Sequence, residues 1–287
     1  EDNGRQTAVT AVAVSHLVLV VATDFGIYIW SESELHRAHG ASMLAKHATS
    51  VEVDRQGTAR LDACAPTASV PITDVSSLYA IPESMNVVVG RANGELVVVS
   101  AISGRMLGAL DLHSPSSVTS MTAVTYQNAE LLVSGDADGL VCVWNVANVL
   151  TQLGASGRAA SASSRGLAHR SEITALTAHG EMNLVITGSG DRTINVCDTQ
   201  SGAVLDILLG HDAAVVALMW SKEKVADGAM LMSVDRGGSV CSWHVSRSGS
   251  QRLSRGKVPF AAEISTAALS NRGIMYLGYE SPDAVVG

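Results

Sequence analysis

The chain has 287 residues, of which 47% are hydrophobic, 16% charged and 4% aromatic, and its formal net charge is −8. A chain of this length and composition can bury a full core, which excludes disorder for most of it. The acidic balance argues against broad binding to nucleic acid or to a membrane surface, since both need a basic field. No apolar stretch approaches the roughly 20 residues that span a bilayer.

In chain order, the apolar runs have the length of strands and are separated by Gly, Asp and Ser turns. One frame recurs five times: a polar turn, an alternating strand, and a closing Trp or its replacement. The closing positions are Trp30, Val99, Trp144, Cys197 and Trp243. Three of the four spacings are close to the roughly 45 residues of one propeller blade.

The repeat divides the chain into successive blades. We place the first three strands of blade one at residues 8–30 and its outer strand near 43–53. The next four blades begin near Ile72, Val118, Ile173 and Val215. Residues 264–287 are interpreted as the first two strands of a sixth blade. Between blades, residues 151–168 are rich in Ala, Ser and Gly and carry two arginines, so we expect a flexible, mildly basic insert there.

A second recurring feature is a small residue followed by His, four residues before the start of an innermost strand. Gly210-His211 precedes the strand that begins at Val215, and Ala168-His169 precedes the strand that begins at Ile173. Together with the closing Trp, these residues resemble the WD-repeat family, in which Gly-His opens the innermost strand and Trp-Asp closes the third. The resemblance covers nearly the whole chain. It implies an all-β WD-repeat β-propeller of six or seven four-stranded blades, at least five of them visible and one truncated. Residues 1–287 are then a single domain, expected to be incomplete at both ends.

The resemblance also implies a buried hydrogen-bonded set in each blade, built from a His, a Ser or Thr of the second strand, a turn Asp and the Trp. The matching positions are His113, Ser134, Asp138 and Trp144 in blade three, His169, Thr187 and Asp191 in blade four, and His211, Ser233 and Trp243 in blade five. A catalytic interpretation would treat them as Ser-His-Asp triads. Recurrence from blade to blade favours a structural role, because such sets satisfy buried polar atoms.

Other patterns resemble ligand sites only in part. Residues 136–139 open like a calcium loop but lack the Glu at its twelfth position, and residues 188–190 lack the third glycine of a dinucleotide loop. His36, His39 and His47 could hold a metal only if a loop folded them inward, and we expect surface histidines instead. We therefore predict no catalytic residue, no cofactor and no metal site.

The four cysteines bear on location. They are far apart, with no C-x-x-C pair and no His at zinc-finger spacing, which indicates neither a disulfide framework nor a structural metal. We expect a reducing, intracellular location, cytoplasmic or nuclear.

The leading functional hypothesis is a non-catalytic scaffold within a multi-subunit protein complex, because propellers present loops from every blade. Arg91, Arg192 and Arg236 fall in the turn between the second and third strands of three blades. They are candidate partner-binding residues that could grip an acidic peptide or an RNA backbone. No membrane partner is expected.

Within scaffolds, the order of features in blades three to five resembles WD-repeat subunits of the complex that processes and remodels the large pre-ribosome, which favours ribosome biogenesis in the nucleus. WD-repeat subunits of ubiquitin-ligase, nuclear-pore or ciliary complexes share most of the pattern and stay open as alternatives. A propeller hydrolase with its site in the central channel is the remote one.

Overall fold

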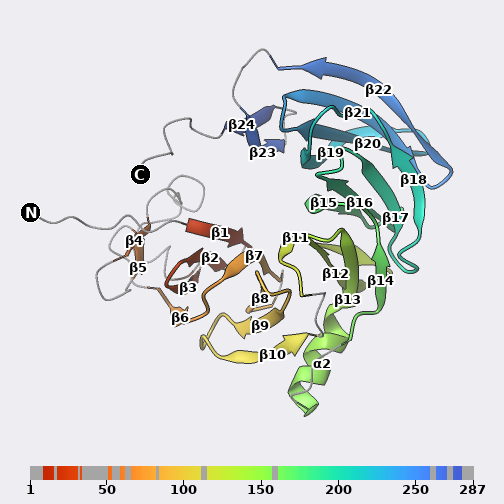
Figure 1. Cartoon of the computed structure of the whole chain (residues 1–287). Helices are drawn as coiled ribbons and strands as arrows, with labels where there is room; N and C mark the ends of the chain where they lie inside the picture. The colour runs from red at the N-terminus through yellow and green to blue at the C-terminus, as the bar shows by residue number, and fades with distance from the viewer. Residues whose placement is uncertain are drawn as a thin grey trace, which may run out of the picture. The chain divides into compact units, whose positions relative to one another are not determined.

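The computed structural model describes residues 9–15, 18–31, 33, 51–53, 59–61, 66–81, 84–110, 115–156, 161–258, 263–269 and 274–279. The chain forms two compact units. Unit 1 comprises Glu1–Val118 and Asn148–Ser161, and unit 2 comprises Thr119–Ala147 and Ala162–Gly287. Figure 1 labels their elements.

Unit 1 holds two four-stranded antiparallel sheets in which strands that follow each other along the chain are hydrogen-bonded neighbours. The first contains β1 (Val9–Val14), β2 (Val18–Thr23), β3 (Gly26–Ser31) and β6 (Ala68–Val70). The second contains β7 (Val75–Ala80), β8 (Asn86–Arg91), β9 (Leu96–Ser100) and β10 (Met106–Leu110). A small hairpin pairs β4 (Val51–Val53) with β5 (Ala59–Leu61).

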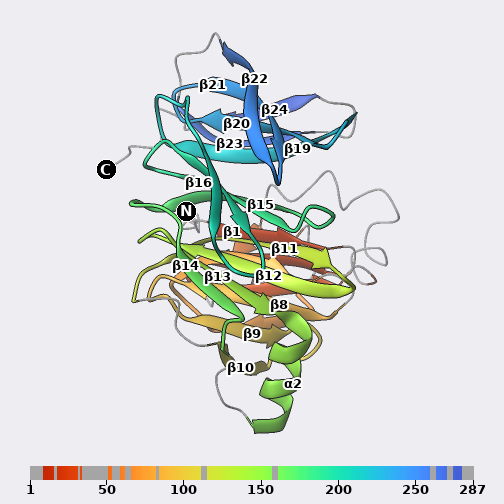
Figure 2. The ribbon, with the colours of Figure 1, turned by 90° about the vertical axis from the view of Figure 1, so that its right-hand side faces the viewer.

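Unit 2 repeats the same sheet three times. The first sheet contains β11 (Val118–Tyr126), β12 (Ala129–Asp136), β13 (Leu140–Asn145) and β14 (Ser164–Leu167). The second contains β15 (Ile173–His179), β16 (Leu184–Ser189), β17 (Ile194–Asp198) and β18 (Val204–Leu208). The third contains β19 (Val215–Val225), β20 (Gly228–Asp235), β21 (Ser239–Ser246) and β22 (Gly249–Lys257). A final pair joins β23 (Ile264–Leu269) to β24 (Met275–Tyr279). Figure 2 shows these sheets from the side.

Apolar β-branched residues explain why these segments are strands. The second strands β2, β8 and β16 are rich in Val, Leu and Ile, and in β2 and β16 all six residues are buried. Such runs fit a sheet that is covered on both faces. The predicted fold class is confirmed: the chain is all-β, with repeated four-stranded antiparallel sheets of the kind that form a WD propeller. The number of blades and the single-domain boundaries stay predictions.

A repeated contact joins consecutive sheets of unit 2 at the first residue of an innermost strand. In unit 2, Thr119 Oγ1 donates to the Ile173 carbonyl at 2.5 Å, and Thr174 Oγ1 donates to the Val215 carbonyl. A hydroxyl at the second position of an innermost strand therefore holds the start of the next sheet.

Two expectations about segments between the blades were wrong. The predicted insert at 151–168 is not a loop at its ends, since α2 (Val146–Ser156) covers its start and β14 covers residues 164–167. Val146, Val149 and Leu153 are all buried, and this helical spacing, not the small-residue composition, determines the structure. The outer strand of blade one is β6 rather than residues 43–53, because β6 pairs with β3 whereas β4 pairs only with β5.

Candidate functional site: the turn end of unit 2

The clearest buried polar set lies in the β19–β22 sheet. His211 Nδ1 lies 3.0 Å from Asp235 Oδ2, and His211 Nε2 lies 2.6 Å from Ser233 Oγ. Trp243 Nε1 donates to the same Ser233 oxygen at 2.8 Å. An ionised carboxylate can only accept, so Nδ1 carries the imidazole proton and Nε2 accepts from the serine hydroxyl. Four side chains from the loop before β19, from β20 and from β21 are thereby fully paired.

The β15–β18 sheet holds a related set without the tryptophan. His169 Nδ1 lies 3.1 Å from Asp191 Oδ2, and His169 Nε2 lies 2.7 Å from Thr187 Oγ1. Cys197 takes the place of the tryptophan and is buried, and this burial raises the pKa of its thiol to about 12. The thiol therefore stays protonated and fills space as a small apolar group.

In the β11–β14 sheet, Trp144 Nε1 donates to Ser134 Oγ at 3.0 Å. His113 lies outside the described residues. The assignment of Asp138 to the buried set was wrong, because Asp138 is exposed and the buried carboxylate is Asp136. Asp136 Oδ1 accepts from the Asp138 and Leu140 amides at 3.0 and 2.8 Å, so it fixes the turn between β12 and β13.

Sequence reasoning also missed Asp235. Asp235 is the last residue of β20, as Asp136 is the last residue of β12. In the β15–β18 sheet the matching carboxylate is Asp191, which lies two residues after the end of β16. Asp235 Oδ1 accepts from the Ser239 amide at 2.7 Å while Oδ2 contacts His211. The signal was present as an Asp at the end of the second strand, followed by a Gly-containing turn, in two of the three sheets.

The electrostatics of these sets favour neutral histidines and ionised carboxylates. Burial lowers the pKa of His169 and of His211 below the ordinary histidine value. Burial by itself would raise the pKa of Asp235, but hydrogen bonds from Ser239 and His211 outweigh it, and the pKa is lowered. The distances from Ser233 through His211 to Asp235 match those of a serine-protease triad. All three side chains are buried, however, and the Ser233 oxygen already accepts the indole N–H, so no substrate reaches it.

These sets fix three turns at one end of unit 2. A Cβ on Gly135, at the end of β12, would lie 2.8 Å from Ile173, at the start of β15. One on Gly188, in β16, would lie 2.7 Å from Val215, at the start of β19. Each sheet therefore begins beside the turn between the second and third strands of the sheet before it. We call this end, formed by residues 136–140, 189–193 and 235–239 and the loops at 168–172 and 210–214, the turn end.

The predicted partner-binding arginines differ in their surroundings. Arg192 and Arg236 are exposed at the turn end. Arg192 adopts a left-handed backbone with φ of 73°, at a position where the neighbouring turns carry Gly139 and Gly238 with φ of 85°. Arg91 lies in unit 1 and is already engaged by Asp74 at 2.9 Å and by Glu95. Its charge is therefore neutralised locally, unlike the charges of the other two.

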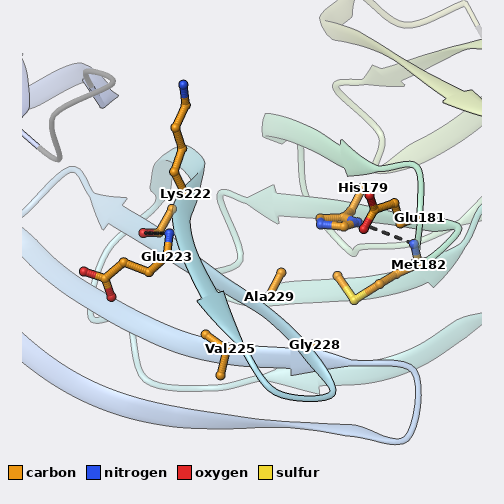
Figure 3. A pocket seen from close by; sticks show the side chains of 9 residues that line it. His179, Glu181, Met182, Lys222, Glu223, Val225, Gly228 and Ala229 are labelled. Carbon is orange, nitrogen blue, oxygen red and sulfur yellow. Dashed lines mark hydrogen bonds between the residues drawn. The ribbon is translucent and has the colours of Figure 1, made fainter.

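The opposite end of the same sheets carries a cavity of about 520 Å³, bordered by the β15–β16 and β19–β20 hairpins. His179 lines it, accepts the Met182 amide at Nδ1 over 3.4 Å and packs edge-on against Trp220 with ring centroids 5.0 Å apart. Figure 3 shows the Lys222 and Glu223 side chains pointing away from His179. The lining carries both acidic and basic side chains, Glu181, Lys222 and Glu223, and these do not point toward a common centre.

In the described part of the chain, no three His, Cys, Asp or Glu side chains cluster as metal ligands, and no helix has the length and apolarity to cross a membrane. His36, His39 and His47 lie outside the described residues. Cys142, Cys197 and Cys241 are buried free thiols.

The family model of the WD domain, G-beta repeat, matches residues 104–145 and 163–198. These two segments are similar to WD repeats. The first match spans β10 to β13 and the second spans β14 to β17. The strand β18 and the whole β19–β22 sheet lie outside both matches.

Two comparisons with known proteins also gave matches. The chain is 28% identical over 189 residues to the sterol regulatory element-binding protein cleavage-activating protein of Xenopus laevis, an alignment that covers 59% of this chain and 14% of that protein. It thus spans about one seventh of the length of this relative. The crystal structure of the computationally designed Ika8 protein is similar with a TM-score of 0.51 and 21% identity, over 97% of this chain and 98% of that one. This likeness supports the fold alone. Neither comparison confirms the resemblance to a pre-ribosome subunit.

Proposed function

We propose that this WD-repeat chain is a non-catalytic protein-interaction scaffold, and that the turn end of unit 2 is one of its binding faces. The observation that carries the proposal is that exposed Arg192 and Arg236 stand on turns whose bases are fixed by buried His–Asp–hydroxyl sets. A rigid turn loses little conformational entropy on binding, so its contacts contribute more fully to affinity.

Arginine at such a position favours a carboxylate-bearing protein segment. Its guanidinium offers a planar, bidentate contact to a carboxylate and keeps its charge at every physiological pH. RNA is less favoured as the partner, since a net charge of −8 on the chain opposes phosphate approach. Asp212 and Glu172 also lie on loops at this end, which restricts any basic contact to the turns themselves.

Several protein complexes are candidates for the assembly to which this scaffold belongs. The relative from Xenopus laevis is named for activating the cleavage of another protein, a role that implies contact with a protein partner and agrees with a scaffold. A role in ribosome biogenesis, or in a ubiquitin-ligase, nuclear-pore or ciliary complex, rests only on the sequence resemblance. Buried free thiols are compatible with the proposed intracellular location, cytoplasmic or nuclear.

The test is native co-purification with the 287-residue chain, identification of the partner, and measurement of its affinity with purified components. Arg192→Glu combined with Arg236→Glu should weaken binding at least about tenfold, because two attractive contacts become repulsive. The melting temperature should change little, since exposed turn substitutions cost little stability.

The matched control is Lys222→Glu combined with Arg105→Glu, which makes the same charge change at exposed positions outside the turn end. It should leave the affinity within about twofold. Equal affinity of the folded turn-end variant and the control would remove the turn end as a binding face. Release of the partner by both variants would indicate an effect of net charge alone.

A further inference from the structure

The outer strand β22 differs from every other outer strand in the described part of the chain. It has nine residues, whereas β6, β10, β14 and β18 have between three and five. All but one of its residues are exposed, and it ends the sheet order β19-β20-β21-β22. Figures 1 and 2 show it as the last ribbon of its sheet. A long, exposed edge presents unpaired backbone groups that most proteins avoid by keeping edge strands short.

The charge of this edge is one-sided. Residues 246–257 carry Arg247, Arg252, Arg255 and Lys257 and no acidic residue, in a chain whose net charge is −8. By contrast, β18, the outer strand of the preceding sheet, carries no basic residue and exposes Leu205 and Ile207. The strands β6 and β10 also carry no basic residue and β14 carries only Arg165, so the cluster of basic residues is a property of β22.

Carboxylates of the chain itself already occupy part of this edge. Asp206 Oδ2, from β18, accepts the Ser250 backbone amide at 2.8 Å. Asp212 accepts from the Arg255 guanidinium, and Asp198 Oδ2 lies 2.7 Å from Arg247 Nη2 just before the strand begins. Both the backbone and the side chains of this region thus bind carboxylates where the chain supplies them.

Two basic groups on the edge contact no carboxylate within the described part of the chain. Arg252 lies exposed on β22, and its guanidinium fills the space that a Cβ on Gly210 would need. Lys257 is exposed at the end of the strand that reaches the turn end, where Val258 N donates to the Gly238 carbonyl. These two residues lie five positions apart along β22, which corresponds to at most about 16 Å of extended strand.

We propose that the outer edge of β22 binds an acidic, extended protein segment, which adds to the sheet as a fifth strand and places carboxylates against Arg252 and Lys257. Strand addition supplies affinity through main-chain hydrogen bonds, and alternate side chains of the added segment supply specificity. A nucleic acid would match the charge but could not use the row of backbone groups. The inference rests on the proposed scaffold function and assigns a second face to it, separate from Arg192 and Arg236.

The experiment uses the 287-residue chain and three synthetic nine-residue peptides. The first alternates Val or Thr with Glu, the second replaces each Glu by Gln, and the third keeps the Glu residues but carries N-methyl groups on alternate amides. Fluorescence anisotropy should detect binding of the first peptide only. Hydrogen exchange, read by mass spectrometry, should show new protection in residues 249–257 and nowhere else.

Arg252→Gln combined with Lys257→Glu should weaken binding of the acidic peptide about tenfold, while Lys222→Glu combined with Arg105→Glu should not. Arg192→Glu combined with Arg236→Glu should also leave it unchanged. The exchange measurement on the unmodified chain keeps the test valid if the β22 variant is unstable.

Equal binding of the N-methylated peptide, tighter binding of a single-stranded RNA nonamer, or protection outside β22 would each overturn the proposal. Loss of the native partner on the turn-end variant, with no peptide protection at β22, would reject this inference and leave the proposed function standing.

Discussion

At the scale of single residues, Ser233 is the centre of the best-formed polar set. Its hydroxyl accepts from the Trp243 indole and donates to His211, and its side chain is fully buried. Thr187 takes its place in the preceding sheet and makes the same contact with His169. A hydroxyl at this point satisfies two buried polar groups at once, which explains its place in both sheets.

Ser233→Ala should therefore lower the free energy of unfolding by about 2 to 3 kcal/mol, because Trp243 Nε1 and His211 Nε2 lose their partner in a buried site. The matched control is Ser242→Ala, nine positions away, whose hydroxyl only pairs with Ser254 at the surface. That change should cost less than about 0.5 kcal/mol. Urea denaturation of both variants measures the difference. Equal losses would show that the buried set contributes nothing beyond an exposed pair.

At the scale of elements, the consecutive sheets of unit 2 meet through small residues and hydroxyls. Gly188 in β16 faces Val215, and Thr174 in β15 donates to the Val215 carbonyl. The second strand can approach the next sheet only where it lacks a side chain. The β19–β22 sheet departs from this pattern, since Val234 and Val216 stand where the other sheets have Gly188 and Thr174.

Gly188→Ala should destabilise the chain by about 1 to 3 kcal/mol, because the new Cβ would lie 2.7 Å from Val215 Cγ1 in a packed interior. Gly256→Ala is the control, since it also lies in a strand and a Cβ there meets nothing within 4 Å. The control should be neutral or stabilising by up to about 1 kcal/mol. Thermal unfolding of the two variants decides the point. If Gly188→Ala is tolerated as well as Gly256→Ala, close approach does not explain the glycine.

At the scale of the whole molecule, buried ionisable groups link stability to pH. The pKa values of His169 and His211 are lower in the folded chain than the ordinary value of 6.5. The unfolded chain then binds more protons as the pH falls below 6.5, so folding becomes less favourable. The pKa of Asp198 is lowered to about 2, where hydrogen bonds from Ser201 and Arg247 outweigh the effect of burial. Its contribution is present above pH 4 and is lost towards pH 2.

We expect the melting temperature to fall steadily from about pH 6.5 to pH 5, and to fall further below pH 4. In a variant with His169→Gln and His211→Gln, the upper part of this dependence should shrink, although the variant is less stable at pH 7. Asp198→Asn should change only the part below pH 4. Differential scanning calorimetry across this range measures both. A melting temperature that is constant or rises between pH 6.5 and pH 5 would contradict neutral buried histidines.

Much of this chain could be predicted from its sequence because the signals are local. The spacing of Trp144, Cys197 and Trp243 and the His residues before two innermost strands predicted the repeated all-β fold, since apolar alternation and turn residues act within a few positions. The same spacing located Ser134, Thr187, Asp191 and His211. The helical spacing of Val146, Val149 and Leu153 was also local, but the small-residue composition that follows it concealed it.

What only the tertiary structure decided depends on where side-chain atoms end in space. Asp235 reaches His211 from the end of its strand, whereas Asp191 reaches His169 from the middle of a turn, and an alignment of turns cannot distinguish the two. Arg91 matched Arg192 and Arg236 in sequence, yet Asp74, 17 positions away, neutralises it. The basic edge of β22 likewise has meaning only once its sheet has formed. Hydrogen bonds and ion pairs depend on distances of a few tenths of an ångström between residues far apart in the chain, and folding alone fixes those distances.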